Sequence, residues 1–221
     1  MIKIENIEIS GWDAAIRTVW NTHSDSYWTY IENPQTLNAA KFQFFLGEKD
    51  LKSMHELIKK GHTDFLRMIN ITCDITAPLY WWNEFDIYKV NAVRNSCSMM
   101  HKITEKEFTL DDFSHEHLSV SSLSILNLVI IALNDAREAF NWCNTEEKKN
   151  WWWQIIKLLP SSYNLKHTVH LNYQDLYNIY CFQTYQSDDW QQFGKMCESL
   201  PYFTEICVNQ FLQEDCENDS N

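Results

Sequence analysis

The chain has 221 residues, of which 45% are hydrophobic, so it can bury one well-packed core and is not an intrinsically disordered protein. Its 18 Lys and Arg residues against 30 Asp and Glu give a net charge of −12, which repels a phosphate backbone and argues against nucleic-acid binding. The seven cysteines include no C-x-x-C pair, which predicts reduced, mostly buried thiols rather than a disulfide framework or a zinc ribbon.

Neither a secretory signal nor a membrane span is expected. The N-terminal stretch "MIKIENIEISGW" lacks a basic segment followed by an apolar run, and the longest apolar run, "LNLVIIAL", is too short to cross a bilayer. The sequence therefore predicts a cytoplasmic protein with no membrane partner.

Apolar residues at helical spacing predict three helices in the first quarter of the chain, over residues 11–22, 33–47 and 50–61. Asn33 and Asp50 are expected to cap the second and third of these, and Gly47 and Gly61 to end them. The pattern then changes to strict alternation of apolar and polar residues over 68–78, which predicts a half-buried strand that ends at Pro78.

The second half is predicted to be mainly helical. The apolar residues of the segment 121–143 nearly encircle it, so this long helix is expected to be central to the fold. Thr145 is expected to cap a helix over 145–160, and a short strand over 167–171 to run directly into a helix over 172–183. An acid-capped helix over 187–201 follows.

Helices before, between and after a few strands predict an α+β fold rather than a doubly wound sheet. Residues 1–210 are expected to form a single α+β domain, and residues 211–221 an acidic, disordered tail.

The strong catalytic motifs are absent from the sequence: there is no G-x-S-x-G elbow, Walker loop, H-E-x-x-H helix or EF-hand loop. The pair His115-x-His117 with two neighbouring aspartates could bind a metal, but a solvated acidic loop is the more usual structure, and no metal site is predicted. Cys97 and His101 have a spacing that allows a thiolate pair, but a core cysteine is more usual, and no catalytic residue is assigned.

The stretch "DIYKVNAVRNSCSMMHKI" (86–103) is unusually polar and follows the aromatic segment "APLYWWNEF". Hydrogen-bonding side chains of both signs beside aromatic rings suit a planar polar ligand that carries phosphate. A polar turn at a subunit interface is an equally good interpretation of these residues alone.

Three segments resemble the flavin-dependent thymidylate synthases. "GHTDFLRMINITCDITAP" (61–78) resembles the family's G-H helix end followed by a strand that ends in A-P, and "VRNSCSMMH" (93–101) resembles its S-x-N-E-x-S-x-R-Y signature. "LLPSSYNLKHTVHLNYQDLYNIYCFQTYQSDDW" (158–190) resembles the family's "LP…T-x-N…L-x-N-F…R…A-Q-W" segment. The resemblance extends over residues 55–102 and 155–195, in the family's order.

This resemblance implies the family's α+β fold, a small antiparallel sheet with surrounding helices, in a homotetramer that binds FAD and dUMP where subunits meet. The implied reaction is methylation of dUMP to dTMP, with methylene-tetrahydrofolate as carbon donor and NADPH-reduced FAD as hydride donor. The implied cofactor-binding residues are Arg67, Lys89, Asn172 and Asn178. The implied substrate-binding residues are Arg94, Asn95, Ser96, Ser98, His101 and Gln183.

The chain also departs from the family pattern. The R-H-R triplet falls on residues 87–90 with Lys89 as its only cation, and two further arginines fall on Met100 and Gln183. Each lost charge-assisted contact is worth about 1.5–3 kcal/mol. The cations Arg67, Lys89, Arg94 and Lys102 are candidates to replace them.

Three hypotheses follow from the sequence. The first is a divergent thymidylate synthase-like protein that binds FAD and a uridine nucleotide. The second is a non-catalytic nucleotide-binding module, sequestering or sensing, in which Trp81, Trp82 and Tyr88 would stack on a base. The third is an oligomeric structural protein whose polar stretch is an interface turn.

Overall fold

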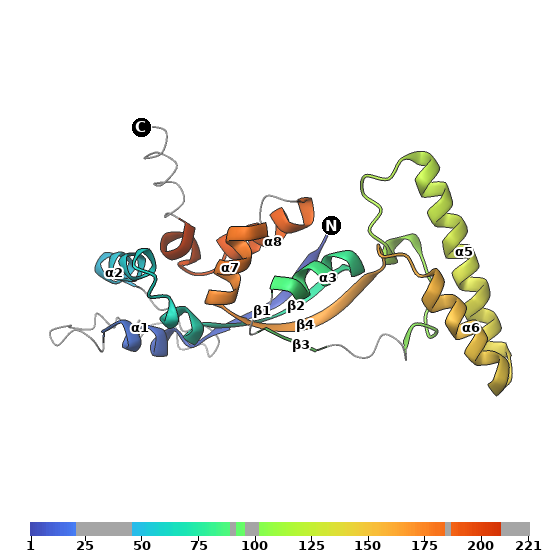
Figure 1. Cartoon of the computed structure of the whole chain (residues 1–221), viewed down its shortest axis with the longest axis horizontal. Helices are drawn as coiled ribbons and strands as arrows, with labels where there is room; N and C mark the ends of the chain where they lie inside the picture. The colour runs from blue at the N-terminus through green and yellow to red at the C-terminus, as the bar shows by residue number, and fades with distance from the viewer. Residues whose placement is uncertain (21–45, 89–91, 96–101, 184–186, 209–221) are drawn as a thin grey trace, which may run out of the picture. The chain divides into compact units, whose positions relative to one another are not determined.

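The computed structural model describes residues 1–20, 46–88, 92–95, 102–183 and 187–208 (Figure 1). Nearly all of the predicted helix 33–47 and the whole of the predicted tail 211–221 lie outside these residues. Contacts divide the chain into two compact units, one of residues 1–6, 73–89 and 93–169 and the other of residues 7–72, 90–92 and 170–221. The prediction of a single domain over 1–210 stays a prediction.

The described strands form an antiparallel sheet in the order β1-β2-β4-β3. They are β1 (Lys3–Ser10), β2 (Asn70–Pro78), β3 (Val93–Asn95) and β4 (Asn164–Asn172). The predicted strands correspond to β2 and β4, whereas β1 and β3 were not predicted. The α+β class is confirmed.

The two central strands have one buried and one open face. In β2, Ile71, Cys73, Ile75 and Ala77 are at most 1% exposed, and the polar residues between them are half-buried. In β4, His167, Val169 and Leu171 are buried, while the polar residues that alternate with them are exposed. Apolar side chains therefore gather on one face of the sheet and polar side chains on the other.

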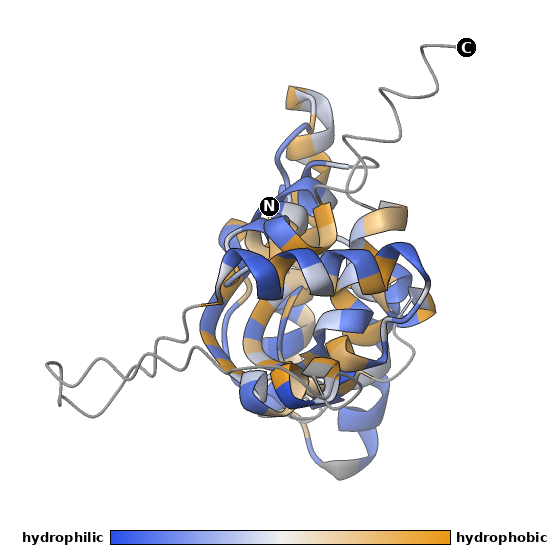
Figure 2. Ribbon diagram, turned by 90° about the vertical axis from the view of Figure 1, so that its left-hand side faces the viewer, coloured by the Kyte–Doolittle hydropathy of each residue, from blue (hydrophilic) through white to orange (hydrophobic). Residues whose placement is uncertain are grey.

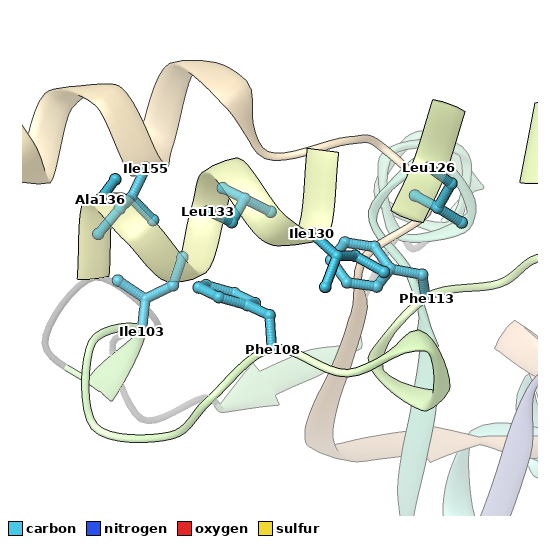
Figure 3. Close-up of a cluster of buried hydrophobic side chains, with 8 residues drawn as sticks. All are labelled: Ile103, Phe108, Phe113, Leu126, Ile130, Leu133, Ala136 and Ile155. Carbon is cyan, nitrogen blue, oxygen red and sulfur yellow. The ribbon is translucent and has the colours of Figure 1, made fainter. Parts of the chain in front are cut away.

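The first unit contains a helical hairpin of two antiparallel neighbours, α5 (Val120–Trp142) and α6 (Thr145–Leu158), together with α3 (Leu79–Tyr88) and the 3-10 turn η2 (Leu110–Asp112). Figure 3 shows the core of the hairpin. Asn134 of α5 pins the incoming loop, because its amide accepts from Phe108 N and donates to Phe108 O, both at 2.9 Å. The core consists of Ile103, Phe108, Phe113, Leu126, Ile130, Leu133, Ala136 and Ile155.

The expectation that the long helix is central is wrong. Only one face of α5 is buried, through Leu126, Ile130, Leu133 and Ala136, while Leu128 and Ile131 on the other side are 65% and 56% exposed. Among the described residues α5 is the one helix long and apolar enough to cross a membrane by length and composition, but only 22% of its apolar window is buried in the protein.

The second unit is built on aromatic packing. Trp12 packs edge-on against Tyr173 at 5.4 Å and against Tyr202 at 5.6 Å between ring centroids. The hydroxyl of buried Tyr173 donates to the Pro201 carbonyl at 2.8 Å, which satisfies the only polar group of that ring. The helical elements are α1 (Trp12–Trp20), α2 (Glu48–Lys59), η1 (Asp64–Met68), α7 (Tyr173–Gln183), α8 (Asp188–Glu198) and η3 (Thr204–Val208).

The caps of α2 and α6 differ from the predictions by three residues and by one. The cap of α2 is Gly47, not Asp50, and the Asp50 carboxylate instead accepts from Gly47 N at 3.1 Å. The cap of α6 is Asn144, not Thr145. Figure 2 shows helix ribbons banded in blue and orange, because hydrophilic and hydrophobic residues alternate along them.

Candidate functional site

Five of the ten candidate side chains lie in the described part of the chain, two in the first unit and three in the second. Lys89, Ser96, Ser98 and His101 lie outside the described residues, as does the side chain of Gln183 at the end of α7. Arg94 and Asn95 are on β3 in the first unit. Arg67, Asn172 and Asn178 belong to the second unit, on η1, the last residue of β4, and α7.

Asn172 joins β4 directly to α7. Its side-chain oxygen accepts from Asp175 N at 2.9 Å, and the Asp175 carboxylate accepts from Asn172 N at 3.4 Å. This reciprocal pair caps the first turn of α7, so Asn172 has a structural role that does not depend on a ligand. Its amide Nδ2 group is the part of the side chain that a ligand could use.

In the same first turn of α7, Gln174 donates from Nε2 to the side-chain oxygen of Asn178, one turn further along the helix, at 3.1 Å. Gln174 is only 8% exposed, and its Oε1 atom is buried without a hydrogen-bond partner in the described part of the chain. An unpaired buried amide oxygen costs about 1–3 kcal/mol, so this position is a candidate for a ligand contact. The sequence prediction missed Gln174, although its i, i+4 spacing from Asn178 could have revealed it.

The turn η1 holds Arg67 against the same helix. Tyr173 N, the first residue of α7, donates to Ile69 O at 2.9 Å, and η1 packs on α7. The Arg67 guanidinium is 58% exposed and lies 3.7 Å from the Asp64 carboxylate, a weak pairing at the surface. The structure therefore places Arg67, Asn172 and Asn178 on neighbouring elements, and their role in binding a cofactor stays a prediction.

In the first unit, Arg94 is already engaged on two sides. Its Nη2 atom lies 3.1 Å from the Asp86 carboxylate, and its guanidinium lies 5.1 Å from the centre of the Trp82 ring. The edge of His167 packs against the same indole at 4.5 Å between centroids. Asn95 is exposed on the short strand β3.

The suggestion that Trp81 and Trp82 stack on a base is not supported. Both indoles are at most 2% exposed, they pack against each other at 5.0 Å, and Trp82 Nε1 donates to Leu165 O at 3.1 Å. They are therefore core residues. Tyr88, at the end of α3, is half-buried.

Four of the described thiols, those with a raised pKa, are not activated nucleophiles. Burial raises the pKa of Cys73 and of Cys181 to about 11, and it raises the pKa of Cys143 and Cys207 as well. These side chains stay protonated near neutral pH. Cys97 and His101, the pair considered from the sequence, lie outside the described residues.

The polar side chains of the acidic loop around His115 form hydrogen bonds and an ion pair within the loop. The Asp112 carboxylate accepts from Lys106 Nζ at 2.8 Å and from Thr109 N at 2.8 Å, and His115 Nδ1 contacts Phe113 O at 2.8 Å. In the part of the chain that the structure describes, no group of three or more His, Cys, Asp or Glu side chains is placed to hold a metal ion.

A surface hollow of about 590 Å³ lies along α6, lined by Asn150, Trp153, Gln154, Lys157 and Leu158. All five residues come from one helix, and none of them is a candidate site residue. The hollow therefore has no connection with either group described above.

No family model and no curated protein matches this chain. Among solved structures, it is similar to flavin-dependent thymidylate synthase from Helicobacter pylori complexed with FAD and dUMP, at 16% identity and a TM-score of 0.60 over 94% of this chain and 98% of that one. A second structure of the Helicobacter pylori enzyme with FAD and dUMP matches at 15% identity and a TM-score of 0.61, over 95% and 98% of the two chains.

The UMP/dUMP methylase PolB from Streptomyces cacaoi, bound with 5-Br UMP, is also similar, at 12% identity and a TM-score of 0.54 over 96% of this chain and 95% of that one. The chain therefore has the fold of the flavin-dependent thymidylate synthases, as the sequence motifs predict. At these identities the likeness is one of fold, and function requires separate arguments.

Proposed function

We propose that this protein is a divergent flavin-dependent thymidylate synthase-like protein that binds FAD and a uridine nucleotide. One observation carries the proposal: the fold is shared over 94–96% of the chain with two structures that hold FAD and dUMP and with one that holds a uridine monophosphate analogue. The order of motifs along the sequence supports the same assignment.

The resemblance assigns the flavin to Arg67, Lys89, Asn172 and Asn178, of which Lys89 lies outside the described residues. Arg67, Asn172 and Asn178 lie on neighbouring elements of the second unit, and the amide groups of Asn172 and Asn178 are donors and acceptors of the kind that a planar heterocycle requires. Buried Gln174 adds an acceptor without a partner among the described residues. When bound and reduced, FAD supplies a hydride, and the chain's own residues bind and orient it.

The nucleotide is assigned to Arg94, Asn95, Ser96, Ser98, His101 and Gln183. Arg94 is the cation in this group whose surroundings are described, and it is paired with Asp86 at 3.1 Å. A phosphate must compete with that carboxylate, so we expect weaker nucleotide binding than in a protein that retains all the family's arginines.

An absorbance spectrum of the purified protein with added FAD, with and without dUMP, tests this proposal. We expect a protein-perturbed flavin band that weakens in Asn178→Ala and persists in the control Asn127→Ala, an exposed change on α5. Failure of a correctly folded protein to bind flavin at any concentration up to about 1 mM, a very weak affinity, would remove the flavin assignment.

A second function is favoured by a specific observation. Arginines of the family pattern fall on Met100 and Gln183, and Arg94 is held by Asp86. Both features suit a non-catalytic module that sequesters or senses a nucleotide. The two functions separate in an assay of dTMP formation with methylene-tetrahydrofolate and NADPH: binding of FAD and dUMP without turnover identifies the module, and turnover identifies the enzyme.

A further inference from the structure

The guanidinium of Arg94 is held by two contacts of different kinds. Its Nη2 atom lies 3.1 Å from the Asp86 carboxylate, and its Cζ atom lies 5.1 Å from the centre of the Trp82 ring. The Asp86 and Arg94 side chains are only 34% and 24% exposed, so solvent and salt screen this ion pair less than a pair at the open surface. We therefore expect the pair to persist in solution.

Helix α3 positions both partners of Arg94. Trp82 and Asp86 are four residues apart, so they lie on the same face of the helix, one turn from each other. The Trp82 indole is itself anchored, because its Nε1 atom donates to Leu165 O at 3.1 Å and His167 packs edge-on against the ring at 4.5 Å between centroids. Asp86 and Arg94 thus stand on a support that the core of the first unit fixes.

The charge of this segment is balanced, unlike that of a typical phosphate site. Between residues 79 and 95 the acids Glu84 and Asp86 offset the bases Lys89 and Arg94, and the whole chain carries a net charge of −12. A phosphate that approaches Arg94 also meets the Asp86 carboxylate, so two negative groups compete for one cation. A neutral ligand meets no such repulsion.

The pair can still bind a ligand through hydrogen bonds. A guanidinium carries more N–H donors, and a carboxylate more acceptor lone pairs, than one contact uses, so the pairing does not by itself exhaust either group. A donor beside an acceptor is complementary to a neutral heterocycle edge that has a carbonyl next to an N–H group, as uracil has.

We infer that Asp86 is a specificity-determining residue that selects against phosphate charge, so that the preferred ligand of this site is a neutral uracil nucleoside rather than a nucleotide. The inference rests on the proposed binding of a uridine ligand at Arg94, and it concerns which part of that ligand the chain recognises. The loss of two arginines of the family pattern, at Met100 and Gln183, acts in the same direction, because it removes cations that would outweigh Asp86.

Titration of the full chain with deoxyuridine and with dUMP, followed by ligand-observed NMR with FAD present, tests the inference. We expect the wild type to bind deoxyuridine at least as tightly as dUMP. Asp86→Asn keeps the shape of the side chain and removes its charge, so it should strengthen dUMP binding by about tenfold or more and leave deoxyuridine binding within about threefold of wild type.

The matched control is Glu84→Gln, which removes the same charge from an exposed position on the same helix. It should leave both affinities within about twofold of wild type, because solvent screens an exposed charge. Circular dichroism shows whether both variants are folded.

The salt dependence of the wild type is a second measurement, and it needs no variant. A phosphate bound by unopposed cations loses affinity steeply as the ionic strength rises. We expect the affinity for dUMP, like that for deoxyuridine, to stay nearly constant between about 50 and 300 mM NaCl.

The outcomes separate this inference from the proposed function. A wild type that prefers dUMP to deoxyuridine by about tenfold or more, or a dUMP affinity that Asp86→Asn leaves unchanged, overturns the inference and leaves the proposed uridine site in place. A steep loss of dUMP affinity with salt overturns it as well, even if Asp86→Asn does not fold. Binding of neither ligand by any of the three folded proteins removes the nucleotide assignment itself, and the inference with it.

Discussion

At the scale of single residues, the Asp74 carboxylate on the open face of the sheet is contacted by three polar side chains. It accepts from Thr168 Oγ1 at 2.7 Å and from Asn6 Nδ2 at 2.8 Å, and Lys166 Nζ lies 3.4 Å away. The hydrogen bond from Thr168, followed by that from Asn6, holds the pKa of Asp74 below its usual value. The charged form is therefore the one that the folded chain stabilises.

We expect Asp74→Asn to reduce the acid sensitivity of folding. Because the pKa of Asp74 is lower in the folded chain, its contribution is fully present above the unfolded pKa of about 3.9 and is lost as the pH falls through the folded value. The variant should be less stable than wild type at pH 7 and closer to it at pH 3 in urea unfolding. Equal destabilisation at both pH values would contradict this assignment.

A comparison of Gly11 with Gly61 distinguishes the backbone strain that an added side chain causes from its steric clash. Both have a positive φ, of 92° and 78°, but a Cβ on Gly11 would lie 1.9 Å from Met68 O, whereas a Cβ on Gly61 meets nothing within 4 Å. Gly61→Ala should cost about 1–2 kcal/mol of backbone strain, and Gly11→Ala clearly more. Thermal unfolding of the two variants is the measurement, and similar losses would show that Met68 moves aside.

At the scale of elements, the first turn of α7 combines a structural and a proposed functional role. Asn172→Ala removes a helix cap and should cost about 1 kcal/mol of stability as well as flavin affinity. Asn178→Ala removes the hydrogen bond of the buried Gln174 amide, so it should cost about 1 kcal/mol of stability and lower flavin affinity by more than that loss explains. Parallel denaturation and flavin titration distinguish the two effects, and the prediction fails if affinity falls only in proportion to stability.

The two faces of α5 should respond very differently to truncation. Leu133 is fully buried in the hairpin core, and Leu133→Ala should cost about 2–5 kcal/mol. Leu128→Ala, on the exposed face of α5, removes little buried area within one chain. At low protein concentration, we expect the second variant to unfold within about 0.5 kcal/mol of wild type. A large loss of stability in this variant would mean that Leu128 is covered within its own chain.

At the scale of the whole molecule, ligand binding should be visible as stability. A ligand that binds only the folded state adds about 2.7 kcal/mol at a hundred times its dissociation constant. We expect FAD and dUMP together to raise the melting temperature more than either alone, and duplex DNA to leave it unchanged because of the net charge of −12. Stabilisation by dUMP alone would favour the module that dispenses with flavin.

Elements that a local sequence pattern defines could be predicted, whereas elements that depend on contacts with distant segments could not. Strand β2 alternates strictly and α2 has apolar residues at helical spacing, so both could be predicted locally. Strand β1 has no buried stripe and β3 is three residues long, so pairing with a neighbouring strand defines them. The segment α3 has aromatic residues on several faces, which obscured its helical period.

The candidate site residues stay a prediction. The motif order selects Asn172, Asn178 and Arg67, and the structure adds only that they lie on neighbouring elements. The burial of Gln174, the Arg94–Asp86 pair and the burial of Trp81 and Trp82 depend on contacts between segments far apart in the sequence. Spacing along the chain carries no information on such contacts.

By itself, the sequence determined the α+β class, the β4–α7 junction and the resemblance to the flavin-dependent thymidylate synthases, because hydrophobic period and motif order are local properties of the chain. Only the tertiary structure decided which face of α5 is buried. The apolar residues nearly encircle that helix, so the sequence offered no preferred side, and packing against Phe108, Phe113 and Ile155 selected one. The other side, with Leu128 and Ile131, stayed exposed.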